Sequence, residues 1–170
     1  AIALAIAGQA QADELVLAEN GQSDYRIVTA PDAGEHLKLA ATELQSFLTQ
    51  ISEAQLPILS AEEPPATHEI ILGDNTHLRR VLPDVDPAAL VPDGFIIRTV
   101  GEHLVIAGSD DRGTLYGVYS FLEDVLGCRW WTPTASYVPR SSRVVVPEID
   151  RRDEPALSFR EVYYQGAMEP

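Results

Sequence analysis

The segment 69–73 contains three large apolar residues in succession, and it limits the possible folds more than any other part of the chain. Because these residues do not alternate with polar ones, we predict a strand that is buried on both faces. Residues 95–100 and 104–107 predict an antiparallel hairpin joined at Gly101-Glu102. Glycine at the first position of this connection favours a type II′ turn.

A first amphipathic helix is predicted over residues 35–51. Its apolar residues recur at three- and four-residue steps and therefore share one face, which a sheet can cover. These residues are Leu37, Ala40, Ala41, Leu44, Leu48 and Ile51. Asp32 is the predicted N-cap, and Glu35, three residues later, completes a capping box.

A second helix begins beside Asp110 or Asp111, either of which can cap it, and ends at Gly127. Two more strands are predicted at residues 15–17 and 25–28, around an Asn20-Gly21 turn. Strands thus mix with two substantial helices, and the best-defined strand pair is antiparallel. We therefore predict an α/β sandwich: a mixed, mainly antiparallel sheet with two main helices packed on it.

The two ends of the chain predict a domain order. Residues 1–12 are interpreted as the remnant of a signal peptide, because they are mostly small and apolar and Ala10-Gln11-Ala12 fits the cleavage pattern. A flexible or partly helical tail is the alternative. We assign residues 13–150 to the α/β domain, and 151–170 to a charged linker followed by the first strand of another domain. The expected location is secreted or periplasmic.

The chain carries a net charge of −14, from 26 acidic residues against 12 lysines and arginines. Such a surface repels phosphate backbones and anionic membranes, so neither nucleic acid nor membrane is an expected partner, whereas a neutral sugar is not disfavoured. No run reaches the ~20 apolar residues of a membrane span. The single cysteine, Cys128, excludes an intrachain disulfide and is expected to be buried. The four histidines are scattered, so no metal or other cofactor is predicted.

No catalytic residue is predicted in this chain. The segment 108–114 follows a strand and opens a helix, as phosphate-binding loops do. However, it lacks the lysine of such loops and carries Asp110 and Asp111 where phosphates would lie. Gly113 and Gly117, four residues apart, instead predict that the helix approaches a neighbour closely, with Arg112 paired to a carboxylate. Glu123 and Asp124 are helix neighbours pointing about 100° apart, so they do not form an acid–base pair.

Trp130 and Trp131 are the candidate carbohydrate contacts, because an indole ring can stack on a sugar. In a strand, neighbouring side chains point to opposite faces. We therefore expect one tryptophan to fill the core, and the other to lie at a domain interface or to serve as a platform for sugar. Both are substrate-binding candidates.

Two segments resemble the domain that precedes the catalytic barrel in α-glucuronidases and β-N-acetylhexosaminidases, and in related uncharacterised bacterial proteins. They are 111–122 (D-R-G-T-L-Y-G-V-Y-S-F-L) and 127–133 (G-C-R-W-W-T-P), and the resemblance extends over about residues 14–150. It implies an α/β sandwich followed by a TIM barrel that carries the catalytic carboxylates. The segment 155–160 resembles the first barrel strand of hexosaminidases, which implies that Arg160 binds sugar hydroxyls. The residues after Arg160 depart from that pattern, and a surface ion pair is the alternative.

A TIM barrel needs at least about 200 residues. Only residues 151–170 follow the predicted domain, so we expect the barrel to lie outside this sequence. The resemblance thus predicts a non-catalytic N-terminal accessory domain of a secreted glycoside hydrolase that acts on polysaccharide or oligosaccharide. Its expected partner is a C-terminal TIM barrel of the same protein, which it packs on and stabilises. A stand-alone carbohydrate-binding module and a protein-interaction domain are the alternatives.

Overall fold

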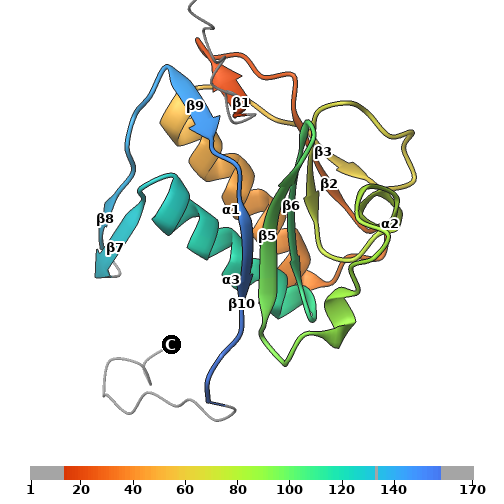
Figure 1. Ribbon diagram of the computed structural model, residues 1–170. Coiled ribbons are helices and arrows are strands. Elements are labelled where there is room, and N and C mark those ends of the chain that lie inside the picture. The colour runs from red at the N-terminus through yellow and green to blue at the C-terminus, as the bar shows by residue number, and fades with distance from the viewer. Residues whose placement is uncertain (1–13, 133, 158–170) are drawn as a thin grey trace, which may run out of the picture.

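The computed structural model describes residues 14–132 and 134–157. Within them, a six-stranded sheet has the strand order β10-β5-β6-β4-β2-β3, and β1–β9 and β7–β8 form two smaller sheets (Figure 1). The large sheet consists of β2 (Arg26–Thr29), β3 (Ile58–Ser60), β4 (Glu69–Leu72), β5 (Phe95–Val100), β6 (His103–Gly108) and β10 (Asp150–Asp153). The small sheets consist of β1 (Leu15–Glu19) with β9 (Arg143–Val146), and β7 (Arg129–Thr132) with β8 (Ala135–Tyr137).

Pairing in the large sheet changes direction at β6. The pairs β2–β3, β2–β4 and β4–β6 are parallel, whereas β5–β6 and β10–β5 are antiparallel. With the antiparallel pairs β1–β9 and β7–β8, four of the seven strand pairs in the described residues are antiparallel. The predicted mixed, mainly antiparallel arrangement is confirmed, and its parallel part is confined to one half of the large sheet.

Helices cover both faces of the large sheet (Figure 1). The long helices α1 (Glu35–Ser52) and α3 (Asp111–Ser120) lie against one face, and the short α2 (Thr76–Val81) lies against the other. A 3-10 turn, η1 (Pro87–Ala89), precedes β5, and a π-helical segment, η2 (Phe121–Val125), extends α3. The predicted sandwich with two main helices is therefore confirmed, as is the burial of all four residues of β4.

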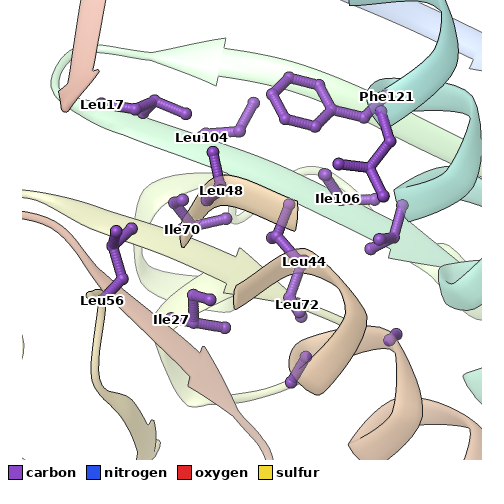
Figure 2. Packing of buried hydrophobic residues seen from close by; sticks show 14 of the residues in the cluster. Leu17, Ile27, Leu44, Leu48, Leu56, Ile70, Leu72, Leu104, Ile106 and Phe121 are labelled. Carbon is purple, nitrogen blue, oxygen red and sulfur yellow. The ribbon is translucent and has the colours of Figure 1, made fainter. Parts of the chain in front are cut away.

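The main core lies between α1, α3 and the large sheet. Leu44 and Leu48 of α1, and Phe121 of η2, meet Ile70 and Ile106 of the sheet (Figure 2). All five side chains are completely buried. Each such burial contributes roughly 1.5–3 kcal/mol relative to an exposed side chain, so this layer is the main support of the fold.

The start of α1 differs from the predicted capping box. Its N-cap is Gly34, and no side chain of its own segment caps it. Instead, Asp111 Oδ2 accepts a hydrogen bond of 2.9 Å from the backbone N–H of Gly34. Asp32 and Glu35 do not form the predicted capping box because the helix begins at Glu35, which leaves Asp32 two residues before the N-cap and puts Glu35 at the first helical position instead of the third.

The start of α3 follows the prediction. Asp110 is its N-cap and accepts a 2.7 Å hydrogen bond from the N–H of Gly113. Gly108 lies so close to α3 that an added Cβ would be 2.2 Å from the backbone of Gly113. Arg112 pairs with Asp93 at 2.7 Å, and Gly127 ends the helical region with a φ of +79°. The predicted helix start and stop and close packing are confirmed.

The strands on either side of Asn20-Gly21 form, but not as a hairpin. Both turn residues have positive φ, and β1 ends there. β1 then pairs with β9, whereas β2 enters the large sheet between β3 and β4. Partners that are distant in the sequence therefore separate two strands that are neighbours along the chain.

At the other end, Arg151, the first residue of the predicted linker, lies in β10. β10 pairs with β5 in antiparallel register, from Asp150 opposite Arg98 to Asp153 opposite Phe95. The charged residues of this segment are compatible with a strand because β10 is at an edge of the sheet, where side chains reach water. The predicted signal-peptide remnant, residues 1–12, and the predicted strand after residue 157 lie outside the described residues.

Candidate functional site

Exposed and half-buried aromatic side chains lie on α3 and on the hairpin β7–β8. We call this group the aromatic surface; it consists of Tyr116, Tyr119, Trp130, Trp131 and Tyr137. Trp131 is 68% exposed and Tyr137 is 52% exposed. Large apolar side chains exposed together in this way are typical of interaction sites, whereas single ones need no explanation.

Trp130 anchors the hairpin to the helices. Its ring lies edge-on to Phe47 of α1, with centroids 5.3 Å apart, and to Tyr119 of α3, with centroids 5.6 Å apart. The Tyr119 hydroxyl donates a 3.1 Å hydrogen bond to Glu43. Burial, with the hydrogen bond to Glu43, raises the pKa of Tyr119 to about 12. Such aromatic pairs contribute about 0.5–1.5 kcal/mol beyond their buried area, so they hold the hairpin in place.

The structure places neither tryptophan in the buried core, although one was expected there. Trp130 is partly covered and still 38% exposed. Among the described residues, β7 pairs only with β8, outside the large sheet, and all four residues of β7 are exposed. The pairing register shifts between Trp130 and Thr132, and Trp131 lies at this irregularity. A bulge of this kind redirects side chains, and here it accompanies the most exposed aromatic ring.

A hollow of about 360 Å³ adjoins the aromatic surface. Tyr116 and Tyr119 of α3 line one side, and Asp153 and Pro155, at the end of β10, line another. The chain therefore leaves the sheet beside the aromatic surface. Arg160, the other predicted substrate-binding residue, lies outside the described residues.

The segment 108–114 has the structural role predicted for it. Thr114 Oγ1 accepts a 2.9 Å hydrogen bond from the N–H of Gly108, and Asp110 caps α3. A hollow of about 240 Å³ lies in front of this segment. It is lined by the carboxylates of Asp32, Asp74, Asp110 and Asp111, among other residues. Four carboxylates repel a phosphate, which agrees with the prediction that no nucleotide binds there.

Sequence reasoning missed a row of ionisable residues at the amino ends of the parallel strands. Arg26, Glu69 and His103 begin β2, β4 and β6, and the register places them side by side. Glu69 is 1% exposed and accepts hydrogen bonds from Arg26 at 2.6 Å and from the N–H of Ala66 at 2.9 Å. His77 of α2 lies 3.1 Å from the same carboxylate. The only indication in the sequence is that each strand begins with an ionisable residue.

The surroundings of Glu69 control its charge. Burial alone would raise its pKa, but hydrogen bonds from Ala66, Arg26 and His77 outweigh burial and leave the pKa below its usual value. Burial lowers the pKa of His103 against the opposing effect of Glu69. Among the described residues, no group of three or more His, Cys, Asp and Glu side chains is arranged to hold a metal ion. Nor does this part of the chain contain a helix with the length and apolar character that crossing a membrane requires.

Solved structures with this fold are parts of larger enzymes. A family GH115 4-O-methyl-α-glucuronidase with specificity for decorated arabinogalactans matches with a TM-score of 0.61 and 17% identity, over 85% of this chain and 19% of its own. The Streptomyces plicatus N-acetyl-β-hexosaminidase matches with a TM-score of 0.56 and 12% identity, over 88% and 25%. The Flavobacterium johnsoniae chitobiase matches with a TM-score of 0.50 and 16% identity, over 86% and 19%. The chain thus has the fold of a domain within glycoside hydrolases, and spans a quarter or less of the length of these relatives.

The sequence itself defines the family. Residues 12–121 match the family described as the glycosyl hydrolase family 67 N-terminus. The chain belongs to this family and is an N-terminal domain of a glycoside hydrolase, as the resemblance predicted. The matched segment includes α1 and α3, whereas the hairpin β7–β8 follows it. No curated protein sequence matches the chain.

Proposed function

We propose that this chain is the non-catalytic accessory domain of a secreted glycoside hydrolase, and that its aromatic surface packs on a catalytic TIM barrel and stabilises it. The exposure of Trp131 and Tyr137 carries this proposal. Aromatic residues and arginine are enriched in the centres of protein interfaces, and Arg129 is opposite Tyr137 in the hairpin register. The surface is rigid because Trp130 is packed against both long helices.

The position of the chain exit supports the same partner. The hollow beside α3 is lined by Tyr116 and Tyr119 and also by Pro155, close to the last described residue. A domain that follows along the chain would therefore start next to the aromatic surface. Leu157, two residues after Pro155, is a further exposed apolar side chain. A short connection raises the effective concentration of the two surfaces, so even a modest interface would be occupied.

We expect the catalytic residues to lie in the barrel and not in this domain. Glycoside hydrolases commonly use a pair of Asp or Glu residues on either side of the bond that they cleave. The named relatives are a glucuronidase, a hexosaminidase and a chitobiase, so we infer a polysaccharide or oligosaccharide substrate. Export follows from the interpretation of residues 1–12 as a signal peptide. Arg160 remains a proposed sugar contact.

Titration calorimetry of this chain against the separately produced catalytic domain tests the proposal, after the coding sequence has been followed past residue 170. We expect binding, and we expect Trp131→Ser to weaken it at least about 30-fold, because aromatic anchors at interface centres contribute ~2 kcal/mol or more. Leu39→Ser on α1, where Leu39 is 44% exposed, is the matched control and should leave binding unchanged. Absence of a catalytic barrel in the extended sequence, or equal binding by Trp131→Ser, would refute the proposal.

The exposure of Trp131 also supports a second candidate function, a carbohydrate-binding module. An exposed indole is a platform on which a sugar ring can stack. This function predicts that oligosaccharides change the tryptophan fluorescence of the isolated chain and that Trp131→Ser abolishes the change. If the chain instead self-associates through Trp131 and does not respond to sugar, a protein-interaction domain is the better description.

A further inference from the structure

The hollow of about 360 Å³ beside the aromatic surface combines aromatic rings with carboxylates. Tyr116 and Tyr119 of the aromatic surface line it together with Phe95 of β5. Three carboxylates also line it, those of Asp93, Glu123 and Asp153. In Figure 1, β10 runs past α3, and residues at the end of β10 complete the hollow. Because both tyrosines line it, a partner that packs on them also covers the hollow.

Two of the three carboxylates have an arginine partner within this chain. Asp93 pairs with Arg112 at 2.7 Å, and Asp153 pairs with Arg151 at 2.8 Å. Glu123, in contrast, has no ion pair among the described residues. The hollow therefore carries one carboxylate that no cation of the described chain neutralises.

The arginine next to the hollow in the sequence does not supply the missing charge. Arg129 uses Nη1 to bind the backbone carbonyl oxygens of Glu123 and Cys128. The carboxylate of Glu123 is instead exposed, so water solvates it in the isolated domain. Its solvation therefore depends on nothing covering this part of the surface.

The exposed carboxylate restricts which surface can pack here. Glu123 follows Tyr119 by one helical turn, so a partner seated on Tyr119 also displaces water from Glu123. Burying an ion without a counter-charge is strongly unfavourable. A purely apolar or acidic partner surface would therefore be rejected, whereas a basic side chain that faces Glu123 would be accepted.

The rings favour arginine over lysine as that basic side chain. Arg151 already places its Cζ 5.9 Å from the centroid of the Phe95 ring while it pairs with two carboxylates. A guanidinium stacks on rings, binds a carboxylate through parallel donors and is less strongly hydrated than an ammonium. The open part of the hollow offers the same combination, with Tyr116 and Tyr119 as the rings and Glu123 as the carboxylate.

We propose that the catalytic barrel docks with one of its arginine side chains in this hollow, where the guanidinium pairs with Glu123 and lies against Tyr116 and Tyr119. This inference rests on the proposed function and states the chemistry of the partner surface. The aromatic surface supplies the contact area, and the hollow supplies a charged contact that fixes the orientation of the two domains.

Titration calorimetry of the full chain against the separately produced catalytic domain tests the charged contact. We expect Glu123→Gln to weaken binding at least about tenfold, because it leaves the arginine buried without its carboxylate. Glu62→Gln is the matched control: it removes the same charge from an exposed glutamate in the loop after β3, at the opposite edge of the large sheet from β10. It should bind like the unaltered chain. Both side chains are exposed, so both variants should fold normally.

A second titration distinguishes arginine from lysine as the occupant. Acetylation of the lysines of the catalytic domain removes their charge and leaves arginine unchanged. The difference in affinity between the unaltered chain and Glu123→Gln should persist after this treatment. If the difference disappears, a lysine occupies the hollow and the proposal is wrong.

Other outcomes separate this inference from the proposed function. If Glu123→Gln and the unaltered chain bind equally well, the arginine contact is refuted while docking of the domains stands. If the unaltered chain does not bind the catalytic domain, the proposed function fails and this inference fails with it. Sedimentation of the isolated chain tests a third occupant, because a dimer that Glu123→Gln dissociates would place a second copy in the hollow and overturn the proposal.

Discussion

Glu69 is a carboxylate with 1% side-chain exposure, and its partners come from three different parts of the chain. Arg26 comes from β2, Ala66 precedes β4, and His77 comes from α2. The second ring nitrogen of His77 lies 3.1 Å from the Glu63 carbonyl oxygen, so each ring nitrogen faces an oxygen atom. The cluster therefore joins α2 to the parallel half of the sheet.

The charge of Glu69 predicts a pH dependence of stability. Its folded-state pKa is lowered, so its contribution is fully present above the unfolded pKa of about 4.3 and is lost as the pH falls through the folded pKa. We expect Glu69→Gln to cost on the order of 3 kcal/mol at pH 7, because Arg26 loses its buried partner. Urea unfolding from pH 7 to pH 3 should show this difference shrinking toward the acid end.

Asp74→Asn provides the control for Glu69→Gln. It removes an exposed ion pair with Arg79, so we expect no measurable loss of stability at any of these pH values. A difference between Glu69→Gln and the unaltered chain that stays constant from pH 7 to pH 3 would contradict the role assigned to the Glu69 charge.

At the scale of elements, the position of α3 is set by its close backbone contact with β6 and by its contact with α1. Gly108 and Gly113 allow the backbones to touch, and Asp111 joins the start of α3 to the start of α1. The same helix carries Tyr116 and Tyr119, so the packing of α3 determines where two of the five residues of the aromatic surface lie. A change that displaces α3 should therefore disturb both stability and the proposed interface.

Two alanine substitutions should differ because of what the added Cβ meets. At Gly108 it would lie 2.2 Å from the backbone of Gly113 and Thr114, whereas at Gly117 it would lie 2.8 Å from a methyl group of Ile106. Backbone atoms cannot move aside as a side chain can. We therefore expect Gly108→Ala to lower the free energy of unfolding by about 3 kcal/mol or more. Gly117→Ala should cost about 1–2 kcal/mol, because the Ile106 side chain can adjust and alanine favours the helix. Thermal unfolding measures both, and equal losses would show that α3 can shift away from β6.

At the scale of the whole molecule, β10 forms one edge of the large sheet. It brings the end of the described chain back alongside β5 and next to the aromatic surface (Figure 1). Arg98 pairs with Asp150 across the two strands, and Arg151 pairs with Asp124 of η2. The residues predicted as a linker thus begin with a strand that belongs to this domain.

Two truncations test where the domain ends. A chain that stops after Ile149 lacks β10, so the backbone groups that β5 presents to it lose their partners. We expect a loss of roughly 2–4 kcal/mol, at about 1 kcal/mol per hydrogen bond, and a Tm lower by about 5–10 °C. A chain that stops after Leu157 retains β10 and should unfold like the full chain. If both truncated chains unfold at the same temperature, β10 adds no stability, and the result supports the predicted domain end at residue 150.

The sequence by itself determined the features that depend on neighbouring residues. Apolar spacing specified both long helices and the doubly buried strand β4, and the position of Gly101 specified the β5–β6 hairpin. Asp110 was identified as a cap, and Trp130 and Trp131 were identified as candidates, because each depends on residue type and local position. These features are encoded locally, since side-chain periodicity follows directly from backbone geometry.

Only the tertiary structure decided which distant segments meet. β1 pairs with β9 rather than β2, Asp111 of α3 accepts from the Gly34 N–H at the start of α1, and the partners of Glu69 converge from three segments. The exposure of both tryptophans accompanies the pairing of β7 with β8 outside the large sheet. Such choices depend on the packing of all elements at once, because a strand or carboxylate has many compatible partners and the fold selects among them.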